Sequence, residues 1–87
     1  MVSATTKIVN PMGLHMRPAQ IFVKEMMSFG CDVSVVYQGK SINAKSIMSL
    51  MAACIKQGSE IEIVCSGENE QDCLKAAVAL IESGLGE

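Results

Sequence analysis

The sequence predicts an α+β fold, an open-faced two-layer sandwich in which three helices cover one face of a mostly antiparallel four-stranded sheet. Segments with alternating apolar residues are interleaved with segments of helical apolar spacing, in the order β-α-β-β-α-β-α. Each predicted element is apolar on one side only, which is typical of two layers that share one core.

The chain begins with a predicted short strand over residues 4–9, in which Thr6 and Ile8 share one face, and residues 10–13 break it as a loop. A helix is predicted over residues 15–29, because apolar residues recur at helical spacing: Ala19, Phe22, Val23 and Met26. Pro18 fits this helix only in the first turn, where its missing N–H is not needed. Gly30 is the predicted end of the helix.

A β-hairpin is predicted next, with strands over residues 32–37 and 40–43 joined by a Gln-Gly turn. Ser46 then stands at a position where a side chain commonly caps a helix. The apolar stripe of this second helix is predicted to contain Ile47, Leu50, Met51 and Cys54.

The last strand is predicted from the alternation of Ile61, Ile63 and Cys65 with polar residues. A loop over residues 66–69 follows, in which Asn69 or a neighbour is the expected cap of the third helix. That helix carries its own apolar stripe and is predicted to end at Gly84: Leu74, Ala77, Val78 and Ile81. We expect residues 1–87 to form a single domain.

The composition argues against several function classes. The formal net charge is −2 and the basic residues form no cluster, whereas nucleic-acid binders need a basic patch. Aromatic residues are few, so a base-stacking platform is not expected. The N-terminus lacks a charged leader with an apolar run, and no apolar run approaches the roughly 20 residues that span a bilayer. We therefore expect a cytoplasmic protein that neither inserts into the membrane nor binds nucleic acid.

The four cysteines are Cys31, Cys54, Cys65 and Cys73, and none forms a C-x-x-C pair. Their even number would allow two disulfides, but without an export signal we expect reduced thiols. Cys54, Cys65 and Cys73 fall within apolar patterns and are predicted to be small core residues. We expect no metal site.

Residues 13–19, Gly-Leu-His-Met-Arg-Pro-Ala, place the only histidine, His15, where a loop becomes a helix. A helix N-terminus presents unpaired N–H groups and about half a positive charge, which suits a phosphate dianion. Arg17 adds a guanidinium for charge-assisted hydrogen bonds to the phosphate oxygens. An imidazole there can attack phosphorus and carry the phosphoryl group without a metal. The alternative is that His15 is only a solvated residue beside a helix start.

Residues 13–19 resemble the active-site motif of the HPr family, the histidine-containing phosphocarriers of the bacterial phosphoenolpyruvate–sugar phosphotransferase system. The length, the order of elements, residues 43–48 (Asn-Ala-Lys-Ser-Ile-Met) and residues 84–87 (Gly-Leu-Gly-Glu) are similar to that family as well. The resemblance implies a phosphocarrier that receives its phosphoryl group from phospho-enzyme I and passes it to sugar-specific enzyme II components. It further implies a monomer that uses no cofactor and is not an enzyme.

The resemblance also implies roles for individual residues. His15 matches the phosphoacceptor, which reacts through Nδ1, and Arg17 matches the phosphate-stabilising side chain. The backbone N–H groups of Met16 and Arg17 would assist. The sequence departs from the family's common pattern at four positions, which leaves open what else orients the phosphate: Met12, Met16, Ser49 and Cys54.

Ser46 has two interpretations. The residues alone favour a helix cap. In the family, Ser46 matches a regulatory site that HPr kinase/phosphorylase modifies in many Gram-positive bacteria, and a catabolite-control transcription factor would be a further partner. A phosphate at a helix start is tolerated by the domain itself, so its effect would fall on partner binding.

Met48 lies off the apolar stripe of its helix and is predicted to be exposed. Together with Met16, Ile47 and Met51 it would form a soft docking patch, since methionine adapts to several partners. The resemblance implies partner contact through this helix.

Two other function classes remain as alternatives. One is a purely regulatory binding protein of the same fold, recognised when Ser46 is phosphorylated, which could dispense with His15. The other is a structural or metal-binding domain that uses the cysteines, against which their spacing argues.

Overall fold

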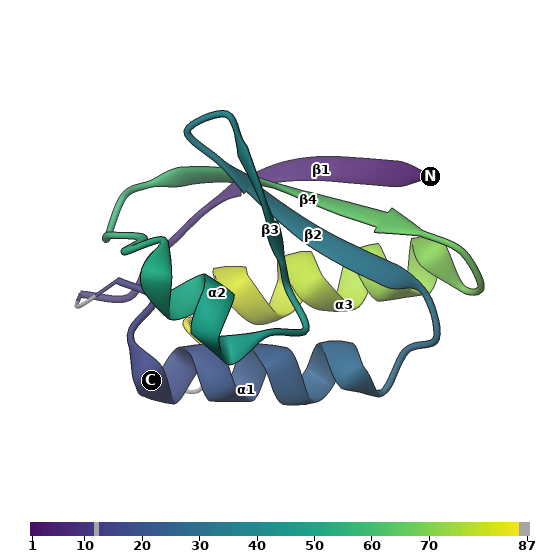
Figure 1. Cartoon of the computed structure of the whole chain (residues 1–87), viewed down its shortest axis with the longest axis horizontal. Helices are drawn as coiled ribbons and strands as arrows, with labels where there is room; N and C mark the ends of the chain where they lie inside the picture. The colour runs from purple at the N-terminus through teal and green to yellow at the C-terminus, as the bar shows by residue number, and fades with distance from the viewer. Residues whose placement is uncertain (12, 86–87) are drawn as a thin grey trace.

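The structure is a computed structural model that describes residues 1–11 and 13–85. Met12 and residues 86–87, which entered the comparison with the HPr family, therefore lie outside the described residues. Its elements follow the predicted order: β1 (Val2–Lys7), α1 (Met16–Met27), β2 (Asp32–Tyr37), β3 (Lys40–Asn43), α2 (Ile47–Ala52), β4 (Glu60–Ser66) and α3 (Glu70–Glu82). The strands form one sheet in the order β1-β4-β2-β3, and all three neighbouring pairs are antiparallel. The helices lie together on one face of this sheet (Figure 1). The predicted fold class is therefore confirmed.

The central strand β4 has the cleanest alternation, as the sequence predicted. Ile61, Ile63 and Cys65 are fully buried under the helices, and the residues between them are half-buried. The hairpin of β2 and β3 is also confirmed, and both residues of its turn, Gln38 and Gly39, have positive φ. A turn of this kind matches the right-handed twist of the two strands.

β1 differs from its predicted bounds. Thr6 and Ile8 are buried as expected, but the strand covers Val2–Lys7 and not residues 4–9. The register explains this, since Val2 already pairs with Cys65 of β4. At the other end, hydrogen bonding continues one residue past β1: the Ile8 N–H donates to the Ser59 carbonyl at 3.0 Å, and the Ile8 carbonyl accepts the Gly58 N–H at 2.8 Å.

Helix α1 buries its whole predicted stripe of Ala19, Phe22, Val23 and Met26, and Pro18 lies in the first turn. The prediction that Gly30 ends the helix is wrong. Ser28 is the C-cap, because its N–H and its hydroxyl both donate to the Glu25 carbonyl, at 3.1 and 2.6 Å. The serine hydroxyl thus competes with the backbone and closes the helix two residues earlier.

The predicted stripe of α2 is only partly confirmed. Leu50 is fully buried and Ile47 and Met51 are half-buried, but Cys54 is exposed, so its prediction as a core residue is wrong. The helix ends at Ala52, and Cys54 has φ +53° directly after the C-cap. This left-handed conformation is the one that glycine adopts after many helices, and it turns the thiol out of the core.

Helix α3 ends at Glu82, and Gly84 terminates it as predicted, in a Schellman motif. The Leu85 N–H donates to the Leu80 carbonyl and the Gly84 N–H to the Ile81 carbonyl, both at 3.1 Å. At its start, Asn69 is the N-cap residue, but with φ +58° its side chain makes no capping bond. Of the expected caps, Asn69 or a neighbour, Asn69 therefore occupies the N-cap position, but without a side-chain hydrogen bond.

None of the helices in the described part of the chain is long and apolar enough to cross a membrane.

Candidate functional site

His15 lies at the start of α1, at the edge of the protein. It is the N-cap residue, with extended backbone (φ −85°, ψ −170°), and its carbonyl accepts the Ala19 N–H at 3.0 Å. Its side chain makes no capping hydrogen bond and is half-exposed. The backbone therefore starts the helix while the imidazole remains accessible for other chemistry.

The loop before His15 is fixed by backbone contacts with the segment that precedes β4. Gly13 has φ +71°, and a Cβ at this position would lie 2.5 Å from the Ile55 carbonyl oxygen. The next residue, Leu14, is buried, and its N–H donates to that same carbonyl at 2.9 Å. Only glycine allows this close approach, so Gly13 sets where His15 stands.

A second support ties the same loop to the end of α3. The Asn10 side chain is buried, and its Nδ2 donates to the Gly84 carbonyl at 2.7 Å. The Asn10 carbonyl in turn accepts the Gly13 N–H at 2.9 Å. The loop that presents His15 is therefore held from two distant parts of the chain.

The imidazole has a defined resting contact. Nδ1 lies 3.3 Å from the Gly13 carbonyl oxygen. A protonated Nδ1 donates to this carbonyl, which leaves the lone pair on Nε2. A nucleophilic Nδ1 needs the other tautomer and a ring turned away from the carbonyl, since two lone pairs repel each other. Reaction at Nδ1 therefore requires the ring to leave this long contact.

The predicted anion-binding groups lie together at this helix end. The N–H groups of Met16 and Arg17 belong to the first turn, which has no intrahelical acceptor for them, and Pro18 has no N–H to add. The Arg17 guanidinium is exposed, and no hydrogen bond or ion pair joins it to another described residue. Two backbone N–H groups and one exposed cation thus belong to the two residues that follow His15.

Ser46 is the N-cap of α2, as predicted. Its Oγ accepts the Ser49 N–H at 3.3 Å, and the residue is half-buried. The preceding Lys45 is held in place by its Nζ, which donates to the Phe29 carbonyl at 2.9 Å. The capping prediction is confirmed, and the hydroxyl stays near enough to the surface to be reached after local opening.

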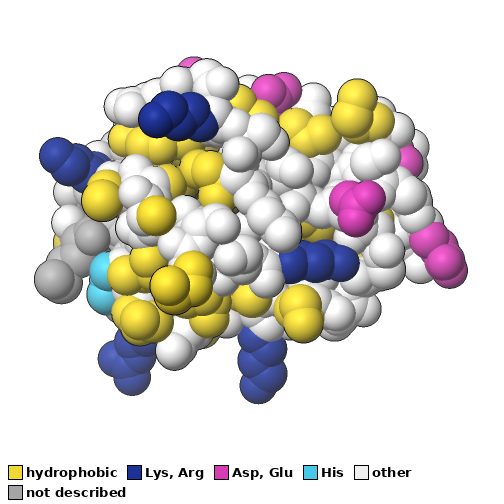
Figure 2. Space-filling model, in the orientation of Figure 1, with side chains coloured by type: hydrophobic (Ala, Val, Ile, Leu, Met, Phe, Trp, Pro, Cys, Tyr) yellow, Lys and Arg dark blue, Asp and Glu magenta, His cyan; other side chains and the backbone are white. Residues whose placement is uncertain are grey.

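An apolar surface lies beside the histidine. Figure 2 shows hydrophobic side chains next to the single histidine, over α2 and the start of α1. Met48 is 81% exposed and Met16 49% exposed, while Ile47 and Met51 are half-buried. The predicted exposure of Met48 is confirmed. We call these four residues the methionine patch.

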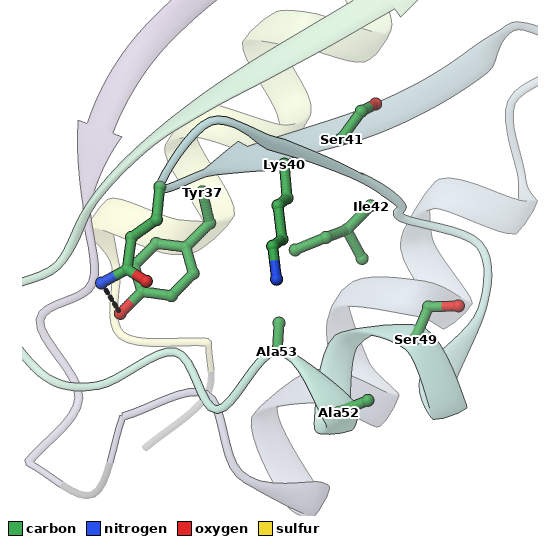
Figure 3. Close-up of a pocket in the computed structure, with 8 residues that line it drawn as sticks. Tyr37, Lys40, Ser41, Ile42, Ser49, Ala52 and Ala53 are labelled. Carbon is green, nitrogen blue, oxygen red and sulfur yellow. Dashed lines mark hydrogen bonds between the residues drawn. The ribbon is translucent and has the colours of Figure 1, made fainter.

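A hollow between the β2–β3 hairpin and α2 lies apart from these groups (Figure 3). It is lined by Tyr37, Ile42, Ser49 and Ala53 among others, and Lys40, which reaches into it, is the one charged residue of its lining. His15 and Arg17 do not line it. We therefore place the candidate site at the start of α1.

One cluster of side chains is not apparent from the sequence and forms only in the folded chain. The Sγ atoms of Cys31, Cys65 and Cys73 all lie within 4.8 Å of one another in the core. All four cysteines are free, and burial raises the pKa of Cys65 and Cys73. Spacing along the chain gave no signal, because the three thiols come from a loop, a strand and a helix.

Comparison with known proteins agrees with this geometry. Residues 2–83 match the family described as the PTS HPr component phosphorylation site. The chain therefore belongs to the HPr family, the phosphocarriers of the sugar phosphotransferase system. Members of this family carry a phosphoryl group and are not enzymes.

Individual relatives cover nearly the whole chain. Phosphocarrier protein HPr of Haemophilus influenzae is 41% identical, over 93% of this chain and 95% of its own length. HPr-like protein Crh of Halalkalibacterium halodurans is 39% identical, over 94% of this chain and 98% of its own. The crystal structure of HPr-C-His from Thermoanaerobacter tengcongensis has a TM-score of 0.95 and 40% identity, and covers 100% of this chain and 98% of that one.

The close contact between Gly13 and the Ile55 carbonyl predicts that a side chain at position 13 destabilises the protein. We expect Gly13→Ala to lower the free energy of unfolding by about 3 kcal/mol, since a left-handed alanine costs about 1–2 kcal/mol and overpacking adds a similar amount. Gly39→Ala is the matched control, because Gly39 also has positive φ (+78°) but open space around it. Gly39→Ala should lower the free energy of unfolding only by the cost of the left-handed alanine, about 1–2 kcal/mol. Equal losses in urea denaturation would contradict the role of the Ile55 contact.

Proposed function

We propose that residues 1–87 form one phosphocarrier domain that accepts a phosphoryl group on His15 from phospho-enzyme I and passes it to sugar-specific enzyme II components. The observation that carries the proposal is the place of the only histidine: it starts α1, and its side chain is half-exposed. Membership of the HPr family supports the assignment.

The proposed transfer is a substitution at phosphorus. The lone pair of Nδ1 forms the phosphorus–nitrogen bond, and the bond between phosphorus and the donor breaks, so that the donor keeps that electron pair. The N–H groups of Met16 and Arg17 and the Arg17 guanidinium would receive the phosphoryl oxygens. The reverse sequence of bond changes passes the group to the acceptor.

The same site would work in a cytoplasmic monomer without a cofactor. The proposed phosphoacceptor and all the proposed hydrogen-bond donors to its phosphate come from three consecutive residues of one chain, 15–17. No second copy is needed to complete the site, and electrostatic stabilisation by amides and a guanidinium replaces a metal.

Partners would dock on the methionine patch. Enzyme I and the enzyme II components are different proteins that must all reach His15, and flexible thioether side chains repack against different surfaces. Figure 2 shows hydrophobic side chains next to the histidine, and Met16 directly follows it in the chain, so docking there would bring a partner's reacting group to the imidazole.

Ser46 is proposed as a regulatory phosphorylation site for HPr kinase/phosphorylase, with a catabolite-control transcription factor as a reader. A phosphate on Ser46 would place about −1.5 to −2 charges at the start of α2, beside the patch. It would lie at the favourable end of the helix, so α2 would persist while acidic partner surfaces are repelled.

A purely regulatory role without phosphotransfer is the second candidate. The similarity to Crh favours it, since a solved structure 38% identical to this chain describes Crh as the catabolite repression HPr of Bacillus subtilis. The presence of His15 with Arg17 two residues later favours the carrier role instead, because a protein read only through Ser46 could dispense with both.

The carrier role predicts an acid-labile phosphate on His15. Incubation with enzyme I and phosphoenolpyruvate should label the unaltered protein fully and His15→Ala not at all. Arg17→Ala should slow labelling about ten- to a hundredfold, the value of one charge-assisted hydrogen bond in a phosphate site. Lys24→Ala removes a cation from the other end of the same helix and should react normally. An unlabelled wild-type protein would leave only the regulatory candidate.

Regulation at Ser46 predicts an acid-stable phosphate made by the kinase with ATP. The label should be lost in Ser46→Ala and kept in Ser49→Ala. Ser46→Asp should change the free energy of unfolding by less than about 1 kcal/mol, because aspartate also caps helices, yet it should slow phosphotransfer from enzyme I. Labelling that survives in Ser46→Ala would refute this assignment.

Docking on the methionine patch predicts that a new charge weakens partner binding inside the patch and not outside it. Met48→Glu should weaken binding to enzyme I at least about tenfold, since it buries an unpaired carboxylate in the interface. Met27→Glu is the matched control, because Met27 is also highly exposed (64%) but lies at the far end of α1. Titration calorimetry with both variants gives the answer, and equal affinities would show that partners dock elsewhere.

A further inference from the structure

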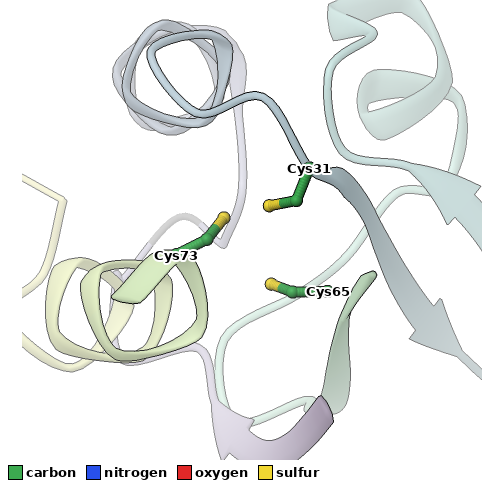
Figure 4. A group of neighbouring side chains, drawn as sticks. All are labelled: Cys31, Cys65 and Cys73. Atoms are coloured by element: carbon green, nitrogen blue, oxygen red, sulfur yellow. The ribbon is translucent and has the colours of Figure 1, made fainter. Parts of the chain in front are cut away.

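The three buried cysteines form a cluster that the phosphocarrier role does not use. Cys31 precedes β2, Cys65 lies in β4, and Cys73 lies in the first turns of α3. Figure 4 shows the three side chains pointing toward one another from these separate elements. Each residue is at most 1% exposed.

The dimensions of the cluster suit one metal ion. Metal–sulfur bonds to cysteine are about 2.3 Å long, so three sulfurs in a plane around an ion are about 4.0 Å apart. The three Sγ atoms already lie within 4.8 Å of one another. Side-chain rotations that move each sulfur by a fraction of an ångström therefore close the triangle.

The donors are soft throughout. Among the described residues no histidine, aspartate or glutamate joins the three thiols within this group. A thioether lies close to them, since Met26 Sδ of α1 is 4.0 Å from Cys73 Sγ. Thiolate and thioether ligands select Cu(I) over ions that prefer oxygen or nitrogen.

The number of donors distinguishes Cu(I) from zinc. Structural zinc sites are almost always four-coordinate, whereas three thiols converge here. An uncompensated charge is expensive in this apolar core, and one thiolate with two protonated thiols would bind a monovalent ion without net charge. Each thiol that binds as a thiolate gives its proton to solvent as the metal–sulfur bond forms, and no electron is transferred.

We propose that Cys31, Cys65 and Cys73 form a binding site for a soft monovalent metal ion of the Cu(I) class. The ion would enter through the loop between β4 and α3. The exposed Gly67 of this loop lies directly over Cys31, since a Cβ on Gly67 would be 3.3 Å from the Cys31 Cα. Opening of this short loop uncovers the cluster without unfolding the sheet.

The site is separate from the phosphocarrier chemistry. His15 and Cys31 flank opposite ends of α1, whose 12 residues span about 18 Å. The proposed metal site therefore does not depend on His15, and phosphotransfer should proceed in the metal-loaded protein.

The test is an anaerobic titration of the full, reduced chain with Cu(I) against a competing Cu(I) chelator, followed by native mass spectrometry and by the luminescence of solvent-shielded Cu(I)–thiolate centres. We expect one ion per chain in the unaltered protein and in Cys54→Ala, which removes only the exposed thiol. Each of three variants should bind Cu(I) at least roughly 10- to 100-fold more weakly: Cys31→Ala, Cys65→Ala and Cys73→Ala. Loss of an outer-shell partner already lowers metal affinity by that factor, and these residues are proposed to bind the ion directly.

A second measurement on the unaltered chain covers the case in which a core variant does not fold. Cu(I) should slow alkylation of the three core cysteines together at least tenfold and leave Cys54 unchanged, as read by peptide mass spectrometry. Protection of Cys54 alone, equal affinity in folded core variants, or replacement of Cu(I) by equimolar Zn²⁺ would overturn the proposal.

Discussion

The presentation of His15 depends on one close contact between two backbone segments. Gly13 lies against the Ile55 carbonyl so tightly that no side chain fits between them, and the same carbonyl accepts the Leu14 N–H. Fixing a loop that has no regular structure costs conformational entropy. The backbone contact, the buried Leu14 and the Asn10 bond to Gly84 together fix it, so α1 begins where the imidazole can meet solvent.

The proposed phosphate site has fewer hydrogen-bond donors than a helix start can offer. Pro18 removes one of the N–H groups that a helix start offers, and the Arg17 guanidinium is exposed on a flexible stem. A carrier must hold its phosphoryl group and also release it, and interactions that stabilise the bound state more than the transition state slow release. Two amides and a mobile cation fit this requirement better than an enclosed pocket.

Local patterns predicted the elements, and long-range contacts decided what those patterns missed. The alternation of β4 and the stripe of α1 were read correctly, because burial follows their period. The ends of elements were less predictable: the Ser28 hydroxyl stops α1 before Gly30, and Cys54 takes the conformation expected of a glycine. In the candidate site, His15, Arg17 and the Ser46 cap were readable from the motif. The contact of Nδ1 with the Gly13 carbonyl was not, because it depends on the fold of the loop.

The cysteines show why a core pattern and a binding site can coincide. A protonated thiol is neutral and small, so it packs as a hydrophobic residue, and the raised pKa of Cys65 and Cys73 keeps both in that form. The same atoms become metal ligands when an ion displaces their protons. An apolar sequence pattern is therefore satisfied by either role, and only convergence in space distinguishes them. Three thiols from a loop, a strand and a helix converge here, at the end of α1 that the phosphocarrier chemistry leaves unused.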